Sequence, residues 1–288
     1  MRIVKPKVEE IKDFIGVDNF YHAVARAARI CYASENNNND KELCARLLKS
    51  KHYSPFSHAI LHLKSTYMET TADNEFIDKI FTLIYSNKYT LQYYGSEIIV
   101  NGRIIAETVN SIEELDEVLD FIKTNNFEFI GDVHPYHFKS FIVDTSIGCT
   151  REMNRHHDNF YICEQSTRYC NFCKNKFGGE VSFNKPYWYD EKNTNFFTKT
   201  LWEDQMKKAE MLYLKAVDPN DFNLPVDIAR GFLPLDTHTR AIYTATLEEW
   251  KHFIDMRLHG NTGKPHGDIK VIAEKINDLI FNKNIITA

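Results

Sequence analysis

The feature that most limits how this chain can fold is a buried strand that leads into a dense run of chargeable side chains. The apolar content of Phe138–Val143 predicts the strand, and residues 151–158 then read Arg-Glu-Met-Asn-Arg-His-His-Asp. A second polar group, Glu-Gln-Ser-Thr-Arg-Tyr, occupies residues 164–169. Chargeable side chains at the end of a buried strand are typical of functional sites, which depend on a rigid scaffold to hold them. We therefore expect the chemistry of this protein to lie in the centre of the chain.

Hydrophobic periodicity predicts more helices than strands. Two capping boxes, Ser111–Glu114 and Thr246–Glu249, mark the starts of helices. The predicted helices are Tyr21–Cys31, Lys41–Leu48, Leu115–Ile122, Thr200–Tyr213, Asp227–Phe232, Leu247–Leu258 and Ile269–Leu279, and a second strand is predicted at Ala59–Tyr67. Because the strands do not alternate with helices in regular βαβ units, the predicted fold class is α+β, with a mixed or antiparallel sheet packed with helices.

The segment from about 70 to 132 is predicted to be an insertion made of a hairpin and a helix. Asn101-Gly102 lies between two apolar runs in Glu97–Glu107, which is the strongest short-range hairpin signal and predicts a type I′ turn. No linker rich in Pro, Gly or Ser separates this segment from its surroundings. We therefore expect one domain over residues 1–288, with the segment as an elaboration of it.

Charge and cysteine content exclude several classes of protein. The 35 Lys and Arg residues against 40 Asp and Glu residues give a net charge of −5, which lacks the basic excess of proteins that bind nucleic acid or anionic membranes. Six cysteines in 288 residues are too few for a disulfide framework. No stretch approaches the ~20 apolar residues of a membrane span, and the N-terminus lacks the apolar run of a signal peptide. A cytoplasmic protein with reduced cysteines is expected.

Arg257 stands out because the sequence places it on an apolar helix face. It follows Phe253 by four residues and Trp250 by seven, so its guanidinium is predicted to lie on the buried side. A buried guanidinium needs a carboxylate, a carbonyl or an anionic ligand, unless the side chain extends to the surface. Arg230, between Ala229 and Gly231, raises the same question more weakly. A structural ion pair and a ligand site both remain open for Arg257.

Two other polar patterns have ordinary alternatives. Glu164 and Arg168 are four residues apart, so they could form an ion pair on a solvated helix that contributes only a few tenths of a kcal/mol. Cys170-x-x-Cys173 could bind zinc together with His156 and His157, or act as a redox pair. A single such pair is a weak signal, so no metal site is predicted.

Four motifs, in this order along the chain, resemble those of the flavin-dependent thymidylate synthases. They are Lys51–His58, similar to His-x-(Thr/Ser)-Pro-Phe-x-His; Arg155–Tyr169, similar to Arg-His-Arg, seven residues and Ser-x-Arg-Tyr; Ala229–Leu235, similar to Ala-Arg-x-x-Leu-Pro; and the C-terminal block Trp250–Ile269. The resemblance covers about residues 20–68 and 137–282, and the segment 70–132 resembles the insertion of the longer members. The chain departs from the signature motif in two ways. His157 stands where the motif has an arginine, and eight residues instead of seven separate His157 from Ser166.

The resemblance implies an activity, its cofactors and an assembly. Members of this family convert dUMP to dTMP with FAD, methylenetetrahydrofolate and NADPH, in a homotetramer whose active sites lie between subunits. The implied dUMP-binding residues are Glu152, Arg155, Glu164, Ser166, Thr167, Arg168, Arg230 and Arg257, of which Arg257 is also the implied catalytic residue. The implied FAD-binding residues are Cys31, His52, Ser54, Arg155, His156, His157, Glu164, Thr246 and His252. The partners are therefore expected to be small molecules, with neither nucleic acid nor membrane among them.

Two alternatives stay open. The changed signature leaves room for a flavin- and folate-dependent methylase or hydroxymethylase that acts on another pyrimidine nucleotide. The Cys170-x-x-Cys173 pair leaves room for a non-enzymatic protein that binds a nucleotide or zinc.

Overall fold

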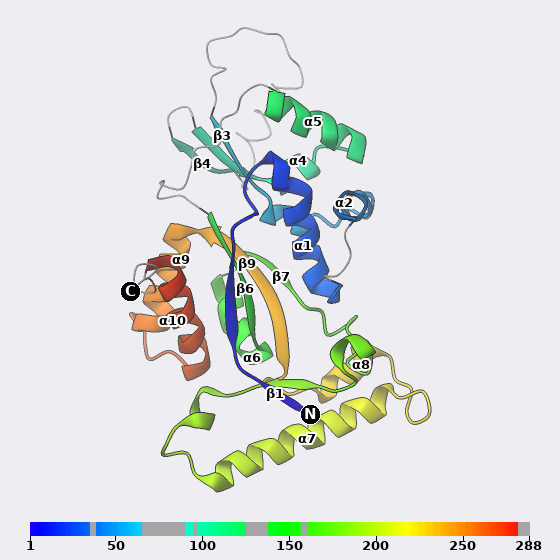
Figure 1. The fold of residues 1–288 in the computed structure, drawn as a ribbon, viewed down its shortest axis with the longest axis vertical. Helices are drawn as coiled ribbons and strands as arrows, with labels where there is room; N and C mark the ends of the chain where they lie inside the picture. The colour runs from blue at the N-terminus through cyan, green and yellow to red at the C-terminus, as the bar shows by residue number, and fades with distance from the viewer. Residues whose placement is uncertain (35–38, 65–89, 95–96, 125–137, 157–159, 282–288) are drawn as a thin grey trace, which may run out of the picture.

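A four-stranded antiparallel sheet forms the centre of the molecule (Figure 1). The computed structural model describes residues 1–34, 39–64, 90–94, 97–124, 138–156 and 160–281. The strand order is β2-β6-β9-β7, with bounds Lys7–Ile11, Phe138–Ser146, His238–Thr246 and Tyr161–Glu164. Strands β6 and β9 pair along their whole length, from Phe138 opposite Thr246 to Ser146 opposite His238. The predicted strand at Phe138–Val143 is confirmed as the inner strand β6.

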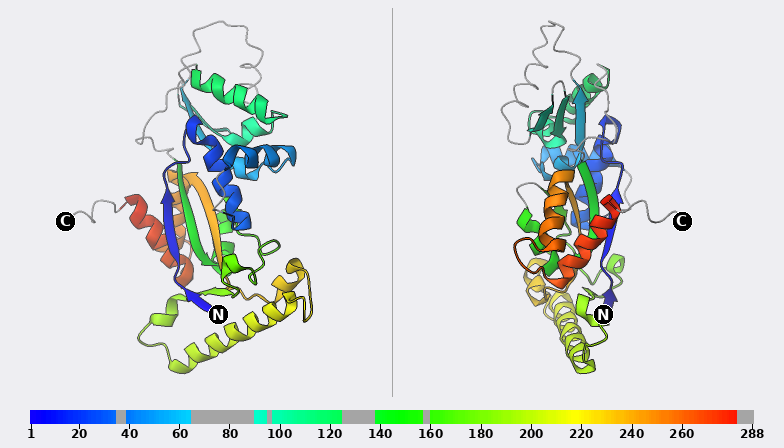
Figure 2. Two further views of the ribbon diagram at one scale, coloured as in Figure 1. Left: turned by 45° about the vertical axis from the view of Figure 1, so that its right-hand side comes forward. Right: turned by 90° about the vertical axis from the view of Figure 1, so that its left-hand side faces the viewer.

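Helices cover both faces of this sheet (Figures 1 and 2). Helix α1 (Phe20–Tyr32) packs on the face that carries Ile142, Cys163 and Ile242, with α2 (Asp40–Lys49) beside it. Helices α9 (Leu247–Ile254) and α10 (Gly267–Phe281) pack on the face that carries Phe141 and Tyr243. Since successive residues of a strand point to opposite faces, neighbouring side chains on one strand enter different cores. The predicted α+β class is confirmed.

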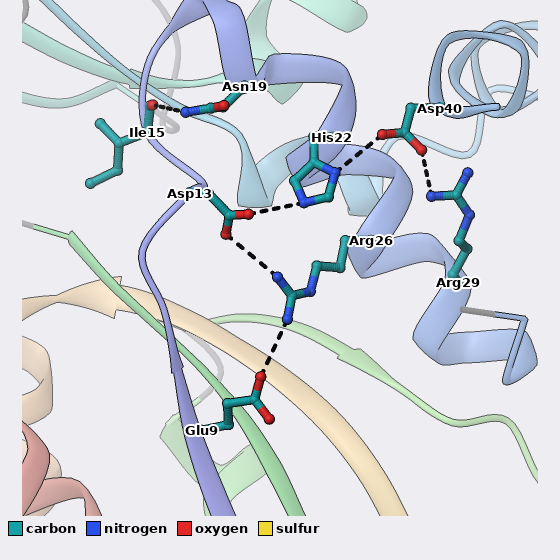
Figure 3. Close-up of polar contacts among 8 residues, drawn as sticks. All are labelled: Glu9, Asp13, Ile15, Asn19, His22, Arg26, Arg29 and Asp40. Atoms are coloured by element: carbon teal, nitrogen blue, oxygen red, sulfur yellow. Dashed lines mark hydrogen bonds and ion pairs between the residues drawn. The ribbon is translucent and has the colours of Figure 1, made fainter. Parts of the chain in front are cut away.

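Ion pairs fix the outer side of α1 to the segments around it (Figure 3). The His22 ring lies between two carboxylates, with Nε2 3.1 Å from Asp13 Oδ2 and Nδ1 3.2 Å from Asp40 Oδ2. Arg29, which is buried, also pairs with Asp40, and Arg26 pairs with Asp13 at 3.5 Å. These contacts join α1 to the chain after β2 and to the first turn of α2.

A second sheet, of order β3-β5-β4, corrects the predicted hairpin. Its strands are Ile60–Lys64, Glu97–Asn101 and Thr90–Tyr94, so β5 pairs with a preceding strand on each side. The chain after Asn101 turns into helix α4 (Gly102–Ala106) instead of a second strand. The Asn101 side chain accepts a hydrogen bond from Arg103 N at 3.0 Å and caps this helix. Asparagine is as well suited to a helix N-cap as to a turn, and the burial of Ile104 and Ile105 favours the helix.

The inserted segment shares a core with α1. Helix α5 (Ile112–Thr124) begins at the predicted capping box, where Glu114 N donates to Ser111 Oγ at 3.2 Å. Leu115 and Val118 of this helix belong to the same buried cluster as Val24 of α1. Residues 65–89 and 125–137 lie outside the described part, so the whole insertion stays a prediction. The shared cluster supports the proposal that residues 1–288 form one domain.

A smaller layer closes one end of the central sheet (Figure 2). Here β1 (Arg2–Val4) pairs in parallel with β8 (Ser182–Asn184), above helix α7 (Phe196–Val217). Helix α8 (Val226–Ala229) and the 3₁₀ turn η7 (Arg230–Phe232) follow, and the chain becomes extended at Leu233, as predicted. Within the described ranges, no helix is both long enough and apolar enough to cross a membrane.

Candidate active site

Arg257 lies in a widened turn that continues α9. The helix begins as predicted, with Thr246 Oγ1 accepting from Glu249 N at 3.2 Å, and its buried face carries Trp250 and Phe253. Residues Asp255–His259 then form a turn of π-helix, a geometry often found at functional sites. The predicted helix Leu247–Leu258 is therefore correct in position, with its last turn widened.

The Arg257 side chain reaches α6 (Ile147–Met153) and the 3₁₀ turn after it. Its Nη1 lies 3.6 Å from Glu152 Oε2, and its Nη2 donates to Glu152 O at 3.3 Å. Its Nε donates to His156 Nε2 at 3.2 Å. The Arg257 side chain remains 18% exposed and that of Glu152 26% exposed, so the pair is open to a ligand. The structural ion pair and the open guanidinium, both left possible by the sequence, are found together.

His156, in η4 (Asn154–His156), is held in its neutral form. Its ring packs edge-on against Phe253 and Phe160, at centroid distances of 5.3 and 5.9 Å, and against His252 at 5.9 Å. Burial, followed by the positive charge of Arg257 and the proximity of His252, lowers the pKa of His156 to about 4. Because Nε2 accepts from Arg257, the proton of the neutral ring resides on Nδ1.

Glu164 is the last residue of β7 and its carboxylate is surrounded by donors. Oε1 accepts from Thr150 Oγ1 at 2.8 Å and from Thr239 Oγ1 at 3.2 Å. Oε2 accepts from Asn154 Nδ2 at 3.3 Å. The solvated helix that would pair Glu164 with Arg168 is wrong, since Glu164 lies in a strand and Arg168 in the turn that follows it.

Cys31 and Ser166 meet on the other face of the sheet. Ser166 N donates to Cys31 O at 2.9 Å, and Cys170 Sγ donates to the same carbonyl at 3.7 Å. The interaction between the Cys31 and Cys163 thiols lowers the pKa of Cys31 and, together with burial, raises the pKa of Cys163 well above its ordinary value. The end of α1 therefore contacts the segment that contains Ser166.

Three of the predicted arginines are exposed, in separate places. Arg155 lies in η4, Arg168 stacks over Tyr169 at 5.5 Å, and Arg230 lies in η7. Among the described residues, no ion pair occupies any of the three guanidinium groups. The question that the sequence raised for Arg230 is resolved by exposure: its side chain lies at the surface.

Most of the remaining predicted residues make no described hydrogen bond to Arg257 or Glu164. Thr167 is half-buried beside Ser166, and Thr246 caps α9. His52 and Ser54 are exposed at the start of the 3₁₀ turn η2 (Ser54–His58). No hydrogen bond or ion pair within the described ranges joins His52, Ser54 or Arg230 to Arg257 or Glu164. His157 lies outside the described residues.

Several residues that build the site were not predicted from the sequence. Three of them, Thr150, Asn154 and Thr239, donate hydrogen bonds to the Glu164 carboxylate, and the fourth, Tyr243, donates to Asn154. Two of them lie on β9, a strand that was not predicted, although the alternation of Thr, Ala and larger residues over 238–246 was a usable signal. The described residues contain no group of three His, Cys, Asp or Glu side chains that could hold a metal ion, and Cys170 is buried while Cys173 is exposed.

Comparison with known families identifies the class of protein. Residues 85–283 match the family described as "Thy1: Thymidylate synthase complementing protein", a match that covers more than half of the chain. The chain belongs to this family. The Lys51–His58 segment precedes the matched region, so its flavin-binding role remains a prediction.

Three individual matches to this chain cover a shorter stretch than the family match or have low sequence identity. A probable flavin-dependent thymidylate synthase of Paramecium bursaria Chlorella virus 1 is 26% identical over 147 residues, which are 48% of this chain and 65% of that protein. Two structures of the UMP/dUMP methylase PolB from Streptomyces cacaoi also align, each covering 97% of this chain and 91% of that one. The structure with 5-Br dUMP has 17% identity and a TM-score of 0.43, and that with 5-Br UMP has 16% identity and a TM-score of 0.45.

Proposed function

We propose that this protein converts dUMP to dTMP by reductive methylation, with methylenetetrahydrofolate as one-carbon donor and NADPH as reductant through FAD. The observation that carries this proposal is the partly exposed Arg257, held by Glu152 and His156 in a member of the Thy1 family. A cation fixed in this way can stabilise the negative charge that develops at N3 and O4 of a uracil ring.

The phosphate of dUMP has donors of suitable chemistry. It carries about two negative charges, and guanidinium groups bind phosphate oxygens through two parallel hydrogen bonds. Arg155, Arg168 and Arg230 are exposed, and Ser166 is half-buried in the turn that precedes Arg168. These groups and Thr167 are proposed to bind the phosphate, while Glu152, Glu164 and Arg257 orient the base.

The residues assigned to FAD fit a flavin in the chemistry of their donors. His156 offers a neutral ring, His252 an exposed ring beside it, and His52 and Ser54 exposed polar groups. Arg155, Thr246, Glu164 and Cys31 complete the proposed set. When bound, a reduced flavin supplies the hydride and carries the one-carbon unit, so no cysteine nucleophile is required.

The separation of the site residues supports an assembly. Arg230 lies in η7, at the same end of the molecule as α8, and makes no described contact with Arg257 or Glu164. A homotetramer in which a second copy brings its Arg230 to the nucleotide would complete the site. Size-exclusion chromatography with light scattering measures the number of copies.

The test is an assay with defined substrates. The purified protein should show flavin absorbance and should release tritium from dUMP labelled at C5 when methylenetetrahydrofolate and NADPH are present. Turnover of another pyrimidine nucleotide without release from dUMP would refute the proposed substrate. A colourless protein with stoichiometric zinc would favour the non-enzymatic alternative.

A further inference from the structure

A fully buried tyrosine next to the site has one hydrogen-bond partner for its hydroxyl among the described residues. Tyr243 is 0% exposed, in the middle of β9, and shares its core cluster with Phe141 and Trp250. Its hydroxyl donates to Asn154 Oδ1 at 2.9 Å. Moving a hydroxyl group from water into an apolar core costs free energy unless the group is hydrogen-bonded. The bond to Asn154 offsets this cost for the Tyr243 hydroxyl.

The contact also holds the other end of the Asn154 amide in place. Nδ2 of the same side chain donates to Glu164 Oε2 at 3.3 Å. In the flipped orientation, the amide oxygen of Asn154 would face the carboxylate, where neither group can donate. The carboxylate, which can only accept, determines that Nδ2 points to Glu164, and the Tyr243 hydroxyl, by donating to Oδ1, holds the amide in that position.

The two oxygens of Glu164 are held by different parts of the structure. Oε1 is bound by Thr150 and Thr239, whereas Oε2 has only Asn154 among the described donors. Asn154 is also the first residue of η4, which contains Arg155 and His156. The Tyr243 hydroxyl therefore reaches two parts of the proposed nucleotide site through one amide.

We propose that Tyr243 is a positioning residue for nucleotide binding: through Asn154 it fixes Oε2 of Glu164 and the turn that contains Arg155 and His156. This inference rests on the proposed function, because the ligand it concerns is dUMP. Tyr243 does not contact the ligand itself, since its ring and hydroxyl are buried in the core.

A matched control separates positioning from packing. Tyr213 of α7 is also 0% exposed, and its hydroxyl accepts one hydrogen bond, from Phe172 N at 3.3 Å. It belongs to a different core cluster, beneath β8. Tyr243→Phe and Tyr213→Phe each remove one buried hydroxyl and one hydrogen bond, so similar losses of thermal stability are expected for both.

The experiment measures dUMP dissociation constants by calorimetry for the purified full-length protein and its variants. A hydrogen bond contributes ~1 kcal/mol, so Tyr243→Phe should weaken dUMP binding about fivefold, while Tyr213→Phe leaves it within about twofold. In an Asn154→Ala background, Tyr243→Phe should add less than about a twofold loss, because the two residues act in series. Unchanged binding by Tyr243→Phe, or losses that multiply, would overturn the inference.

A second measurement does not depend on the nucleotide. Side-chain amide NMR of Asn154 should show slow solvent exchange of the Nδ2 hydrogens in the wild type and in Tyr213→Phe, and fast exchange in Tyr243→Phe. If the wild-type protein does not bind dUMP, the proposed function fails, and these exchange rates still decide whether Tyr243 holds the Asn154 amide in place. Equal exchange in all three proteins refutes that holding role.

Discussion

Arg257 Nε donates a hydrogen bond to His156 Nε2 at 3.2 Å, so a positively charged guanidinium is bonded to the imidazole ring of His156. The imidazole can accept this bond only when it is neutral, which agrees with the lowered pKa of His156. The neutral ring leaves the positive charge on Arg257, where the proposed reaction needs it. The two residues come from separate segments, η4 and the widened turn after α9.

Replacing Arg257 tests the proposed catalytic cation. Arg257→Ala should remain folded and flavin-bound, because the pair it leaves behind is partly exposed, but turnover should fall at least ~100-fold, the usual loss when one group that stabilises a transition state is removed. Lys251→Ala, which removes an exposed cation from the same helix, serves as the control. Wild-type tritium release by Arg257→Ala would show that its assigned role is wrong.

The protonation of His156 gives a pH prediction. Its pKa is lowered to about 4 in the folded protein, against ~6.5 in the unfolded chain, so the unfolded state takes up the proton first as pH falls. The contribution of His156 to stability is therefore complete above about pH 6.5 and is lost as pH falls towards 4. We expect its ¹⁵N NMR shifts to stay those of the Nδ1–H tautomer from pH 8 to 5, and His156→Gln to flatten the fall in the free energy of unfolding. An imidazolium spectrum at pH 6 would contradict this.

Replacing Gly102 by alanine tests whether the first residue of α4 must be a glycine. A Cβ at this position would lie 2.6 Å from Phe20 Cε2 and 3.0 Å from Phe56 O, and both phenylalanines are buried. Gly102→Ala should therefore lower the free energy of unfolding by about 1–3 kcal/mol, the usual cost of overpacking, despite the better helix propensity of alanine. Gly231→Ala, which meets nothing within 4 Å, is the matched control in urea denaturation. Equal stability of the two variants would mean that Phe20 can move aside.

The Cys31–Cys163 contact gives a reactivity prediction. The interaction with Cys163 lowers the pKa of the Cys31 thiol, whereas partial burial raises the pKa of the Cys173 thiol. Since the thiolate is the reactive form, Cys31 should react with iodoacetamide at pH 7 faster than Cys173, although it is less exposed. Peptide mapping by mass spectrometry measures both rates, and Cys163→Ala should slow the reaction of Cys31. A Cys31 rate that Cys163→Ala leaves unchanged would rule out the contact as its cause.

Local signals in the sequence were sufficient for most of the longer helices and for part of the site, but not for the short helices α4 and α6. The capping boxes at Ser111 and Thr246 are both found. The spacing after Trp250 predicted Arg257 on the buried side of its helix, and its side chain is 18% exposed. Contacts distant in sequence were not predictable in the same way. Asn101-Gly102 is compatible with a turn or a helix start, and only Phe20 and the buried isoleucines of α4 decide between them.

The surroundings of Glu164 show the same limit. Its donors come from α6, η4 and β9, and β9 begins 74 positions after Glu164. No spacing rule relates such segments, because their proximity follows from the pairing of β7 and β6 with β9. The sequence could therefore indicate Glu164 as a site residue without indicating what holds it.

The widened turn at Asp255–His259 makes the direction of Arg257 depend on residue count as well as residue type. A π turn contains one residue more than the α-helical turn it replaces, so deleting Met256 would let the backbone close into an ordinary helix. Each residue of an α-helix advances by about 100°, so the deletion would change the direction of the Arg257 side chain relative to Glu152 and His156. We therefore expect a one-residue change in length, which a substitution scan does not sample, to separate Arg257 from Glu152 and His156.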